Sequence, residues 1–335
     1  MPSRCRIYLL TYRQPKLLVR ALQSIVRQTF TDWVCEIHND DPTDSFPDKL
    51  AAEVNDRRIT VVNHPVNLGG TKAFNLVFRS VEEPYVTLLE DDNWWEPNYL
   101  RRLIEVMDQH PAVNVIGSNA CRWRMESDAT WTQLETFVPP TNEVKLCYWP
   151  VAYILTGNRL GNAALLCRSA NISDYIVPEE TSLAATESVR ERAFPHPFLF
   201  LTEPLGNFAC RPTTNRSSDQ LDVAPVLLVA SIFELVPFKE ATLRDFWQSL
   251  GGGQKNRDSW FRFFFAGMIC PKVKALTKFA DTTQRATFIA YCLRHPKVVK
   301  AVSRSRTTHS QLWSFLMDNT AKRLLEAQAR GFDSL

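Results

Sequence analysis

The most informative stretch of the 335-residue chain lies at 85–97 and reads YVTLLEDDNWWEP. Its first five residues form a short, mainly apolar run that predicts a buried strand. Three carboxylates follow at once, those of Glu90, Asp91 and Asp92. Adjacent carboxylates repel one another and are best tolerated beside a cation, and oxygen ligands favour Mg²⁺ or Mn²⁺ over zinc. The alternative is a solvated acidic turn in which Asn93 caps the following helix.

The residues on either side of this strand alternate between strand-like and helix-like patterns. Short apolar runs predict further strands at 6–10, 33–38, 59–62 and 113–116. Amphipathic spacing predicts helices at 17–26, 71–80 and 97–109, and Pro15 suits the first turn of the first helix. Strands that alternate with helices indicate parallel βαβ units, so we expect an α/β fold with helices on both faces of a mostly parallel sheet.

The second half of the chain has a different character. Apolar runs predict strands at 163–167 and 198–201, and residues 178–192 read as a loop followed by a helix. Helical patterns follow at 261–268, 286–292 and 311–325, and the glycines at 251–253 predict a hinge or loop. We therefore expect one α/β domain at 1–218, with halves at 1–120 and 121–218, and a helical region at 219–335.

Composition excludes several classes of protein. The chain is 45% hydrophobic and 22% charged, which rules out collagen-like and disordered chains. No apolar run approaches the ~18 residues that span a bilayer, and the first residues contain no signal-peptide pattern, so we expect a cytoplasmic protein. The eight cysteines have no CxxC spacing, which predicts reduced, buried thiols and no zinc site.

The charge is distributed unevenly. Residues 1–214 carry 21 Lys/Arg and 26 Asp/Glu, whereas residues 251–306 carry 12 Lys/Arg and 2 Asp/Glu. The basic segment is consistent with a solvated helical face, with peripheral contact to the anionic inner face of a membrane, or with an anionic glycan or another subunit. Nucleic acid is not an expected partner, because the chain has no nucleic-acid-binding motif and its first half is acidic.

Polar side chains follow three of the predicted strands. Thr11 and Tyr12 follow the first, Asp40 and Asp41 the second, and the acidic cluster that includes Asp91 the fourth. Ligands bind beyond the carboxyl ends of the strands in open parallel sheets, so we expect these residues to converge on one crevice. Asp-Pro-Thr-Asp at 41–44 is also a common turn sequence, and a tyrosine after a strand is commonly just packed.

An ordered set of motifs resembles glycosyltransferase family 2, the inverting nucleotide-sugar enzymes of the GT-A fold. The motifs are YLLTYRQP at 8–15, LQSIVRQTFTDW at 22–33, NDDPTD at 39–44, NLGG at 67–70, AFN at 73–75 and the stretch at 85–97. The resemblance covers about residues 5–120, with a weaker extension through 203–205. It implies a Rossmann-like GT-A domain that binds a nucleoside-diphosphate sugar, with a UDP-sugar first among the candidates.

The resemblance also implies roles for individual residues. Asp41 matches the aspartate that reads the nucleobase, with Asp40 as its neighbour, and Tyr12 falls where the family packs near the base. Asp91 matches the first acidic position of the DXD-type motif, near the ribose. Asp92 matches the ligand of the divalent metal, Mn²⁺ or Mg²⁺, that bridges the diphosphate.

The resemblance also implies that a further segment lines the donor site through Asn67, Lys72 and Asn75.

Two positions depart from the family pattern. Arg13 stands where the family commonly has asparagine, and Phe74 stands where it often has arginine. These departures concern the identity of the donor rather than the class of reaction.

An inverting transferase needs a carboxylate that takes the proton of the acceptor hydroxyl. In the family this base lies in the second half of the domain, and the segment AATESVRER at 184–192 resembles its acidic stretch. Glu187 is the first candidate and Glu180 the second. Each is also interpretable as a surface carboxylate of a helix.

The sequence thus predicts a metal-dependent inverting glycosyltransferase that acts on a glycan or lipid-linked acceptor, with polysaccharide biosynthesis as the family context. One alternative is a nucleotide- or glycan-binding scaffold of the same fold without a catalytic base. A nucleotidyltransferase is the weaker alternative, because the first strand is followed by TYRQP at 11–15 rather than by a glycine-rich phosphate loop.

Overall fold

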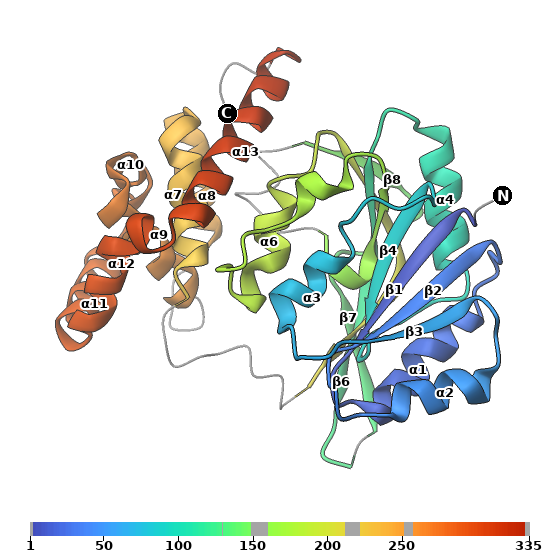
Figure 1. Ribbon diagram of the computed structural model, residues 1–335. Helices are drawn as coiled ribbons and strands as arrows, with labels where there is room; N and C mark the ends of the chain where they lie inside the picture. Colours follow the sequence, from blue (N-terminus) through green and yellow to red (C-terminus); the bar gives the residue numbers. More distant parts are fainter. Residues whose placement is uncertain (1–2, 129, 149–159, 212–221, 251–256, 332–335) are drawn as a thin grey trace. The chain divides into compact units, whose positions relative to one another are not determined.

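The computed structural model describes residues 3–128, 130–148, 160–211, 222–250 and 257–331 (Figure 1). The chain divides into two compact units, and each unit is assembled from separate stretches of sequence. The first unit comprises residues 1–147, 158–176 and 194–214, and the second comprises 148–157, 177–193 and 215–335. Residues 177–193, which precede the boundary expected at 218, therefore belong to the second unit by their contacts.

The first unit is built on a ten-stranded sheet. The strands run in the order β3-β2-β1-β4-β9-β6-β10-β5, with β7 beside β6 and β8 beside β10. Their bounds are β1 Cys5–Thr11, β2 Trp33–Asn39, β3 Ile59–Asn63, β4 Tyr85–Glu90, β5 Trp94–Trp95, β6 Val115–Met125, β7 Trp131–Thr136, β8 Val144–Cys147, β9 Leu165–Arg168 and β10 Phe198–Cys210.

The sheet has a parallel arm and a mixed remainder. Strands β3, β2, β1 and β4 are all parallel, as the alternating pattern predicted. Beyond β4 the sheet changes, because β9 is antiparallel to both of its neighbours and β7, β8 and β5 are also antiparallel to their partners. The expected strands and the GT-A fold are confirmed, and the sheet as a whole is mixed.

Helices cover the parallel arm. They are α1 Pro15–Val26, α2 Phe46–Val54, α3 Gly70–Leu76 and α4 Tyr99–Gln109, and Figure 1 shows α1 and α2 beside β1–β3. Apolar side chains of α1, α2 and α4 share one buried cluster with alternate residues of β1, namely Cys5, Ile7 and Leu9. Because successive strand residues point to opposite faces, Tyr8 and Leu10 face the other side of the sheet.

Strand β10 is longer than the run at 198–201 predicted. It continues to Cys210 alongside β6, and its register shifts on both sides of Pro204. A proline has no N–H to donate to the ladder and is found in sheets at edges or bulges. The proline hides the continuation of the strand from an apolar-run reading, and the bulge lets the ladder resume from Gly206.

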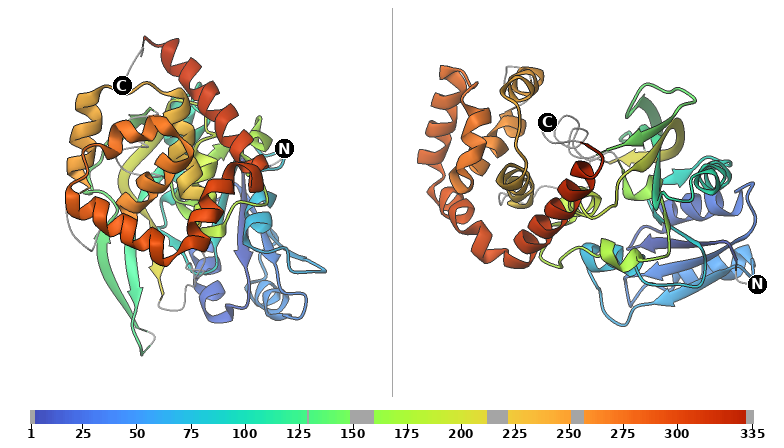
Figure 2. Two further views of the ribbon diagram at one scale, coloured as in Figure 1. Left: turned by 90° about the vertical axis from the view of Figure 1, so that its left-hand side faces the viewer. Right: turned by 90° about the horizontal axis from the view of Figure 1, so that it is seen from above.

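The second unit is helical, as expected for the end of the chain. It contains the 3₁₀ helix η3 Leu183–Ala185 and the helices α6 Thr186–Glu191, α7 Ala224–Leu235, α8 Glu240–Ser249, α9 Arg257–Ile269, α10 Lys274–Thr277, α11 Thr282–Arg294, α12 Pro296–Thr308 and α13 Ser310–Gln328. Figure 2 shows the gold to red helices α7–α13 packed on one another. The hinge expected at 251–253 lies outside the described residues.

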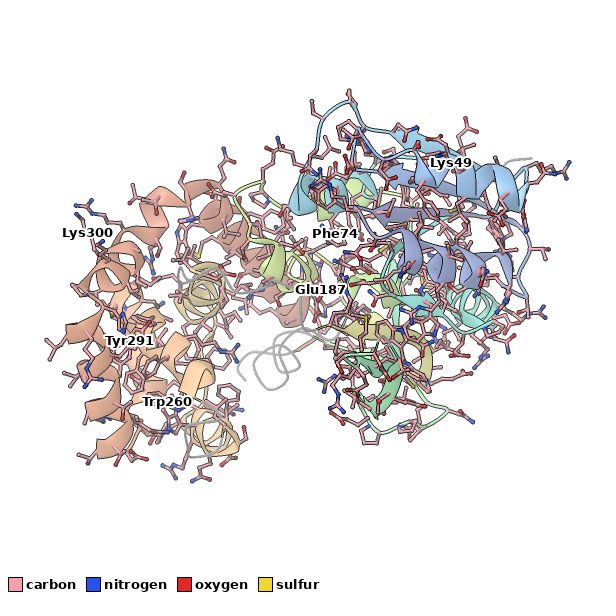
Figure 3. All side chains as sticks on the ribbon, turned by 90° about the horizontal axis from the view of Figure 1, so that it is seen from below. Lys49, Phe74, Glu187, Trp260, Tyr291 and Lys300 are labelled. Carbon is pink, nitrogen blue, oxygen red and sulfur yellow. The ribbon has the colours of Figure 1, made fainter. Side chains whose placement is uncertain are left out.

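Aromatic side chains form the core of this unit. Trp260, Phe261, Phe263 and Phe265 of α9 are all buried, in a cluster that also contains apolar residues of α7, α11 and α13. The described lysines of the same basic segment are exposed, and Lys300 projects from α12 in Figure 3. The buried aromatic face and the exposed basic face are what a solvated helical unit requires.

The buried arginine Arg192 connects three helices of the second unit. It follows α6, is fully buried, and donates to Ser231 Oγ of α7 at 3.2 Å and to Leu228 O at 3.3 Å. It also donates to Thr320 Oγ1 of α13.

Among the described residues, no helix combines the length and the apolar character that a membrane span needs.

Candidate active site

The carboxyl end of β1 is bonded directly to the end of β4. Asp91 Oδ2 accepts hydrogen bonds from Thr11 Oγ1 at 2.8 Å and from Tyr12 N at 3.0 Å. Burial, and after it the charge of Asp92, raises the pKa of Asp91 to about 7. Asp91 thus joins two strand ends, as the convergence of the motifs predicted.

The carboxyl end of β2 is joined to the same point. Asp40 N donates to Thr11 O at 3.0 Å, and the Asp40 side chain is 6% exposed. Its Oδ1 accepts from Leu68 N at 2.6 Å and its Oδ2 from Gly69 N at 3.1 Å, while Asn67 Nδ2 donates to Asp40 O at 3.0 Å. Both carboxylate oxygens of Asp40 are therefore engaged in holding the loop at 67–69, which leads into α3.

The neighbouring Asp41 accepts hydrogen bonds from Thr43 and from the exposed side chain of Arg13. Its Oδ1 accepts two hydrogen bonds from Thr43, from N at 3.0 Å and from Oγ1 at 2.7 Å. Its Oδ2 accepts from Arg13 Nε at 2.6 Å. Arg13 and, after it, Thr43 lower the pKa of Asp41 to about 2, so the carboxylate is ionised throughout the neutral range.

Arg13 adopts an unusual backbone conformation. Its φ of 56° lies in the left-handed region, which costs a non-glycine residue about 1–2 kcal/mol. This conformation places the guanidinium carbon 5.0 Å from the centroid of the Tyr12 ring, within cation–π range. Tyr12 is 44% exposed, so its ring is an accessible surface beside Asp41.

Two arginines surround Asp92. Arg211 Nη2 donates to Asp92 Oδ2 at 2.9 Å, and Arg20 Nη2 donates to Asp92 O at 2.8 Å. The Arg20 guanidinium lies over the rings of both Trp94 and Trp131, 3.6 and 4.2 Å from their centroids. Burial lowers the pKa of Arg20 to about 10, with the charge of Asp92 opposing the shift.

Asp92 offers a single carboxylate to a divalent cation, and Arg211 occupies one of its two oxygens. Within the described ranges no group of three His, Cys, Asp or Glu side chains could hold a metal ion. A cation such as Mg²⁺, which keeps several waters and binds one or two carboxylates together with substrate phosphates, needs no larger protein cage. Asp92 could supply that carboxylate once Arg211 leaves Oδ2.

The remaining donor-site candidates lie on α3. Lys72 is exposed and Asn75 is half-buried, and both follow the loop that Asp40 holds. Phe74, labelled in Figure 3, is half-buried on the same helix. The structure thus brings Thr11, Tyr12, Asp40, Asp41 and Asp91 together at the strand ends, with Asp92 next to them.

Comparison with known proteins identifies the fold that carries this site. Residues 7–168 match the family model described as glycosyl transferase family 2. Residues 7–168 belong to this family. The matched segment contains every donor-site residue predicted from the sequence, and the resemblance seen in the motifs is confirmed.

Individual relatives agree with this family. The putative colanic acid biosynthesis glycosyl transferase WcaA of Escherichia coli is 30% identical over 95 residues, which cover 28% of this chain and 34% of the relative. An uncharacterized glycosyltransferase of Nostoc is 30% identical over 108 residues, covering 31% of this chain and 33% of the relative. The chain therefore spans about a third of the length of these relatives.

Solved structures show the fold across nearly the whole chain. The crystal structure of TarS of S. aureus superimposes with a TM-score of 0.58 over 90% of this chain and 55% of TarS, at 15% sequence identity. The fold is therefore that of a GT-A glycosyltransferase with an additional helical region. The family domain and this likeness together support a glycosyltransferase.

The two candidates for the catalytic base lie in the second unit. Glu187 is half-buried in the first turn of α6 (Figure 3). Glu180 Oε1 accepts a hydrogen bond from Leu312 N at 2.6 Å, in the first turn of α13. A carboxylate at a helix N-terminus satisfies an otherwise unpaired N–H, so Glu180 has a structural partner that its sequence position did not reveal.

Sequence reasoning missed the basic side chains of the site. Arg13 was noted at the end of the first strand and as a departure from the family pattern, without a predicted partner, and Arg20 and Arg211 carried no signal. The Asp-Pro-Thr-Asp sequence at 41–44 did indicate a turn, and within it Thr43 N donates to Asp41 Oδ1, a contact that was not predicted. The arginine contacts join residues 28 and 119 positions apart in the chain, which no local pattern records.

Proposed function

We propose that the protein is a metal-dependent inverting glycosyltransferase. It takes a sugar from a nucleoside-diphosphate sugar and transfers it to a hydroxyl of a glycan or lipid-linked acceptor. The observation that most supports this is the junction of β1, β2 and β4 at Thr11, Asp40 and Asp91, within a family 2 domain. The likeness of the domain to the colanic acid transferase WcaA supports a role in polysaccharide biosynthesis.

In the proposed complex each strand end binds one part of the donor. Tyr12 and Asp41 bind the base, Asp91 binds near the ribose, and Asn67, Lys72 and Asn75 line the donor site. Asp92 holds Mn²⁺ or Mg²⁺, which when bound supplies Lewis-acid stabilisation of the diphosphate leaving group. A nucleotide donor is also supported by the structural neighbour TarS, which has been solved in complex with UDP.

The proposed transfer is a single displacement. The acceptor oxygen attacks the anomeric carbon, and the bond from that carbon to the diphosphate oxygen breaks with its electron pair leaving on the diphosphate. The hydroxyl proton passes to a carboxylate, for which Glu187 is the first candidate. Glu180 is the weaker candidate, because its Oε1 is engaged by the N-terminus of α13.

Nucleotide titration tests the donor half of the proposal. We expect calorimetry with UDP, GDP and dTDP to show binding that Mn²⁺ strengthens, and Asp92→Asn to weaken this metal-dependent binding at least ~10-fold. Glu53→Gln, which changes an exposed carboxylate of α2, is the matched control and should bind as the unchanged protein does. Equal binding by Asp92→Asn, or no binding of any nucleotide, would count against the proposal.

The second candidate function is a nucleotide- or glycan-binding scaffold of the same fold. The helix-capping role of Glu180 favours it, because this takes one of the two predicted bases out of reach of a reaction. Release of sugar from a bound UDP-sugar, measured with Glu187→Gln, separates the two. The transferase loses turnover and keeps nucleotide affinity, whereas a scaffold shows no turnover to lose.

We also propose that the basic segment 251–306 contacts an anionic membrane surface that carries a lipid-linked acceptor. Its exposed lysines support this contact, while Trp260, Phe261, Phe263 and Phe265 are buried and would take no part. Co-sedimentation with phosphatidylserine vesicles should fall when Lys297 and Lys300 are changed to glutamine. Sedimentation that is unaffected by this change argues for a solvated face instead.

A further inference from the structure

We propose that Arg13 occupies the position of the nucleobase until a nucleotide binds, and that a base reaches Asp41 only by displacing the Arg13 guanidinium. The inference rests on the proposed nucleotide-sugar function and adds a specificity-determining residue to it. It further favours uracil or thymine, which present one imide N–H, over guanine, because Asp41 has one exchangeable oxygen. Three features of the site carry the argument.

The first feature is that Arg13 makes the contacts a base would make. A guanidinium is flat and presents N–H donors at its edge, as a nucleobase does. That of Arg13 lies 5.0 Å from the Tyr12 ring centroid and donates to Asp41 Oδ2 at 2.6 Å. A base stacked on Tyr12 and bonded to Asp41 would occupy the same volume and use the same acceptor.

The second feature is the ease with which Arg13 can leave. Its side chain is 62% exposed, whereas that of Asp41 is 5% exposed, so the fixed partner is the carboxylate and the movable one is the arginine. An ion pair whose cation is mostly in water is screened and weak.

The third feature is the occupation of the other carboxylate oxygen. Thr43 donates to Asp41 Oδ1 from both its backbone and its hydroxyl, so only Oδ2 is offered to a ligand. Guanine presents two adjacent N–H donors that match both oxygens of a carboxylate, as an arginine fork does. Uracil and thymine present one imide N–H, which a single oxygen satisfies.

The exchange has a measurable consequence, because a competitor attached to the protein weakens binding of the ligand it opposes. Removing the guanidinium should therefore strengthen nucleotide binding, contrary to the usual effect of deleting a site residue. Arg13→Asn is the suitable change, since asparagine tolerates the left-handed conformation and is too short to hold the place of the base. Arg13→Lys keeps a competing cation.

The experiment is calorimetric titration of the full chain with UDP, dTDP and GDP at fixed Mn²⁺. We expect the unchanged protein to prefer UDP or dTDP to GDP, and the comparison of these two shows whether the thymine methyl group is accommodated. Arg13→Asn should bind the preferred nucleotide ~3- to 5-fold more tightly. The nucleotide affinity of Arg13→Lys should lie between those of the unchanged protein and Arg13→Asn. Arg57→Asn, at an exposed arginine of the same unit, should leave the nucleotide affinity unchanged.

A second variant tests the role of Thr43. Thr43→Val removes the hydroxyl donor and so frees Asp41 Oδ1 from one of its two hydrogen bonds. The difference in affinity between UDP or dTDP and GDP should therefore become smaller. Unchanged or weaker nucleotide binding by Arg13→Asn, or a preference for GDP in the unchanged protein, overturns the inference and leaves the transferase proposal standing. Absence of binding by all three nucleotides, with and without the Arg13 change, overturns both.

Discussion

Replacing Asp40 by alanine should release the loop at 67–69 and the start of α3. The two oxygens of this buried side chain accept the backbone N–H groups of Leu68 and Gly69 at 2.6 and 3.1 Å. A hydrogen bond to a charged group contributes about 1.5–3 kcal/mol, and its loss is partly offset when water can reach the donor. Because Leu68 and Gly69 are half-buried, we take about 1 kcal/mol for each bond, or about 2 kcal/mol in total.

Hydrogen exchange measures this opening locally. A loss of about 2 kcal/mol accelerates exchange roughly 30-fold in a segment that opens by itself, so amides of 68–76 should exchange at about that factor above the unchanged protein. Asp128→Ala is the control, because Asp128 makes a similar turn bond to Thr130 N on an exposed hairpin, and its loss should leave 68–76 unaffected. Unchanged exchange at 68–76 in Asp40→Ala would refute the assignment of Asp40 as the residue that holds this loop.

Three further outcomes follow from buried charges and from the proposed base. Burial raises the pKa of Asp91 to about 7, above the ~3.9 of an unfolded chain, so its favourable contribution is complete below about pH 4 and is lost as the pH rises through about 7. In EDTA, the urea midpoint of Asp91→Asn should therefore rise relative to that of the unchanged protein between pH 5 and pH 8, and parallel curves would contradict this. Arg192→Ala removes hydrogen bonds to Ser231 and Leu228 and should cost the second unit about 2–3 kcal/mol in urea unfolding, whereas the exposed Arg294→Ala should cost little. Glu187→Gln should lower transfer at saturating donor at least ~100-fold while leaving UDP affinity unchanged, and retained transfer would remove Glu187 as the base.

The parallel arm and the site at its end were predictable because their determinants are local. Each strand from β1 to β4 is a short apolar run followed directly by polar residues, and parallel strands place those residues at one edge. Asp41 and Asp91 could be placed from their own neighbours in the sequence. The proline at 204 shows the limit of this reading, because a strand that continues through a bulge does not look continuous in the sequence.

The rest of the site depends on contacts between residues far apart in the chain. An arginine that follows a strand is usually interpreted as a solvated side chain. The residues near Arg13 and Arg211 in the sequence do not indicate which carboxylate each arginine binds. Glu180 looked like a free acid in an acidic segment, and its partner Leu312 lies 132 residues further on. Such pairings follow from the assembled fold, and periodicity or composition does not encode them.

The interleaving of the two units affects how the chain is made on the ribosome. Residues 177–193 bury Val177, Ala185 and Val189 in the core of the second unit, and Arg192 bonds to Thr320, 128 residues later. At a synthesis rate of about 5–20 residues per second, this segment waits roughly 6–25 s for its partners to emerge. During that interval the apolar side chains of this segment are exposed to chaperones. In a fragment that ends before α7 they would have no core to pack into and would stay exposed.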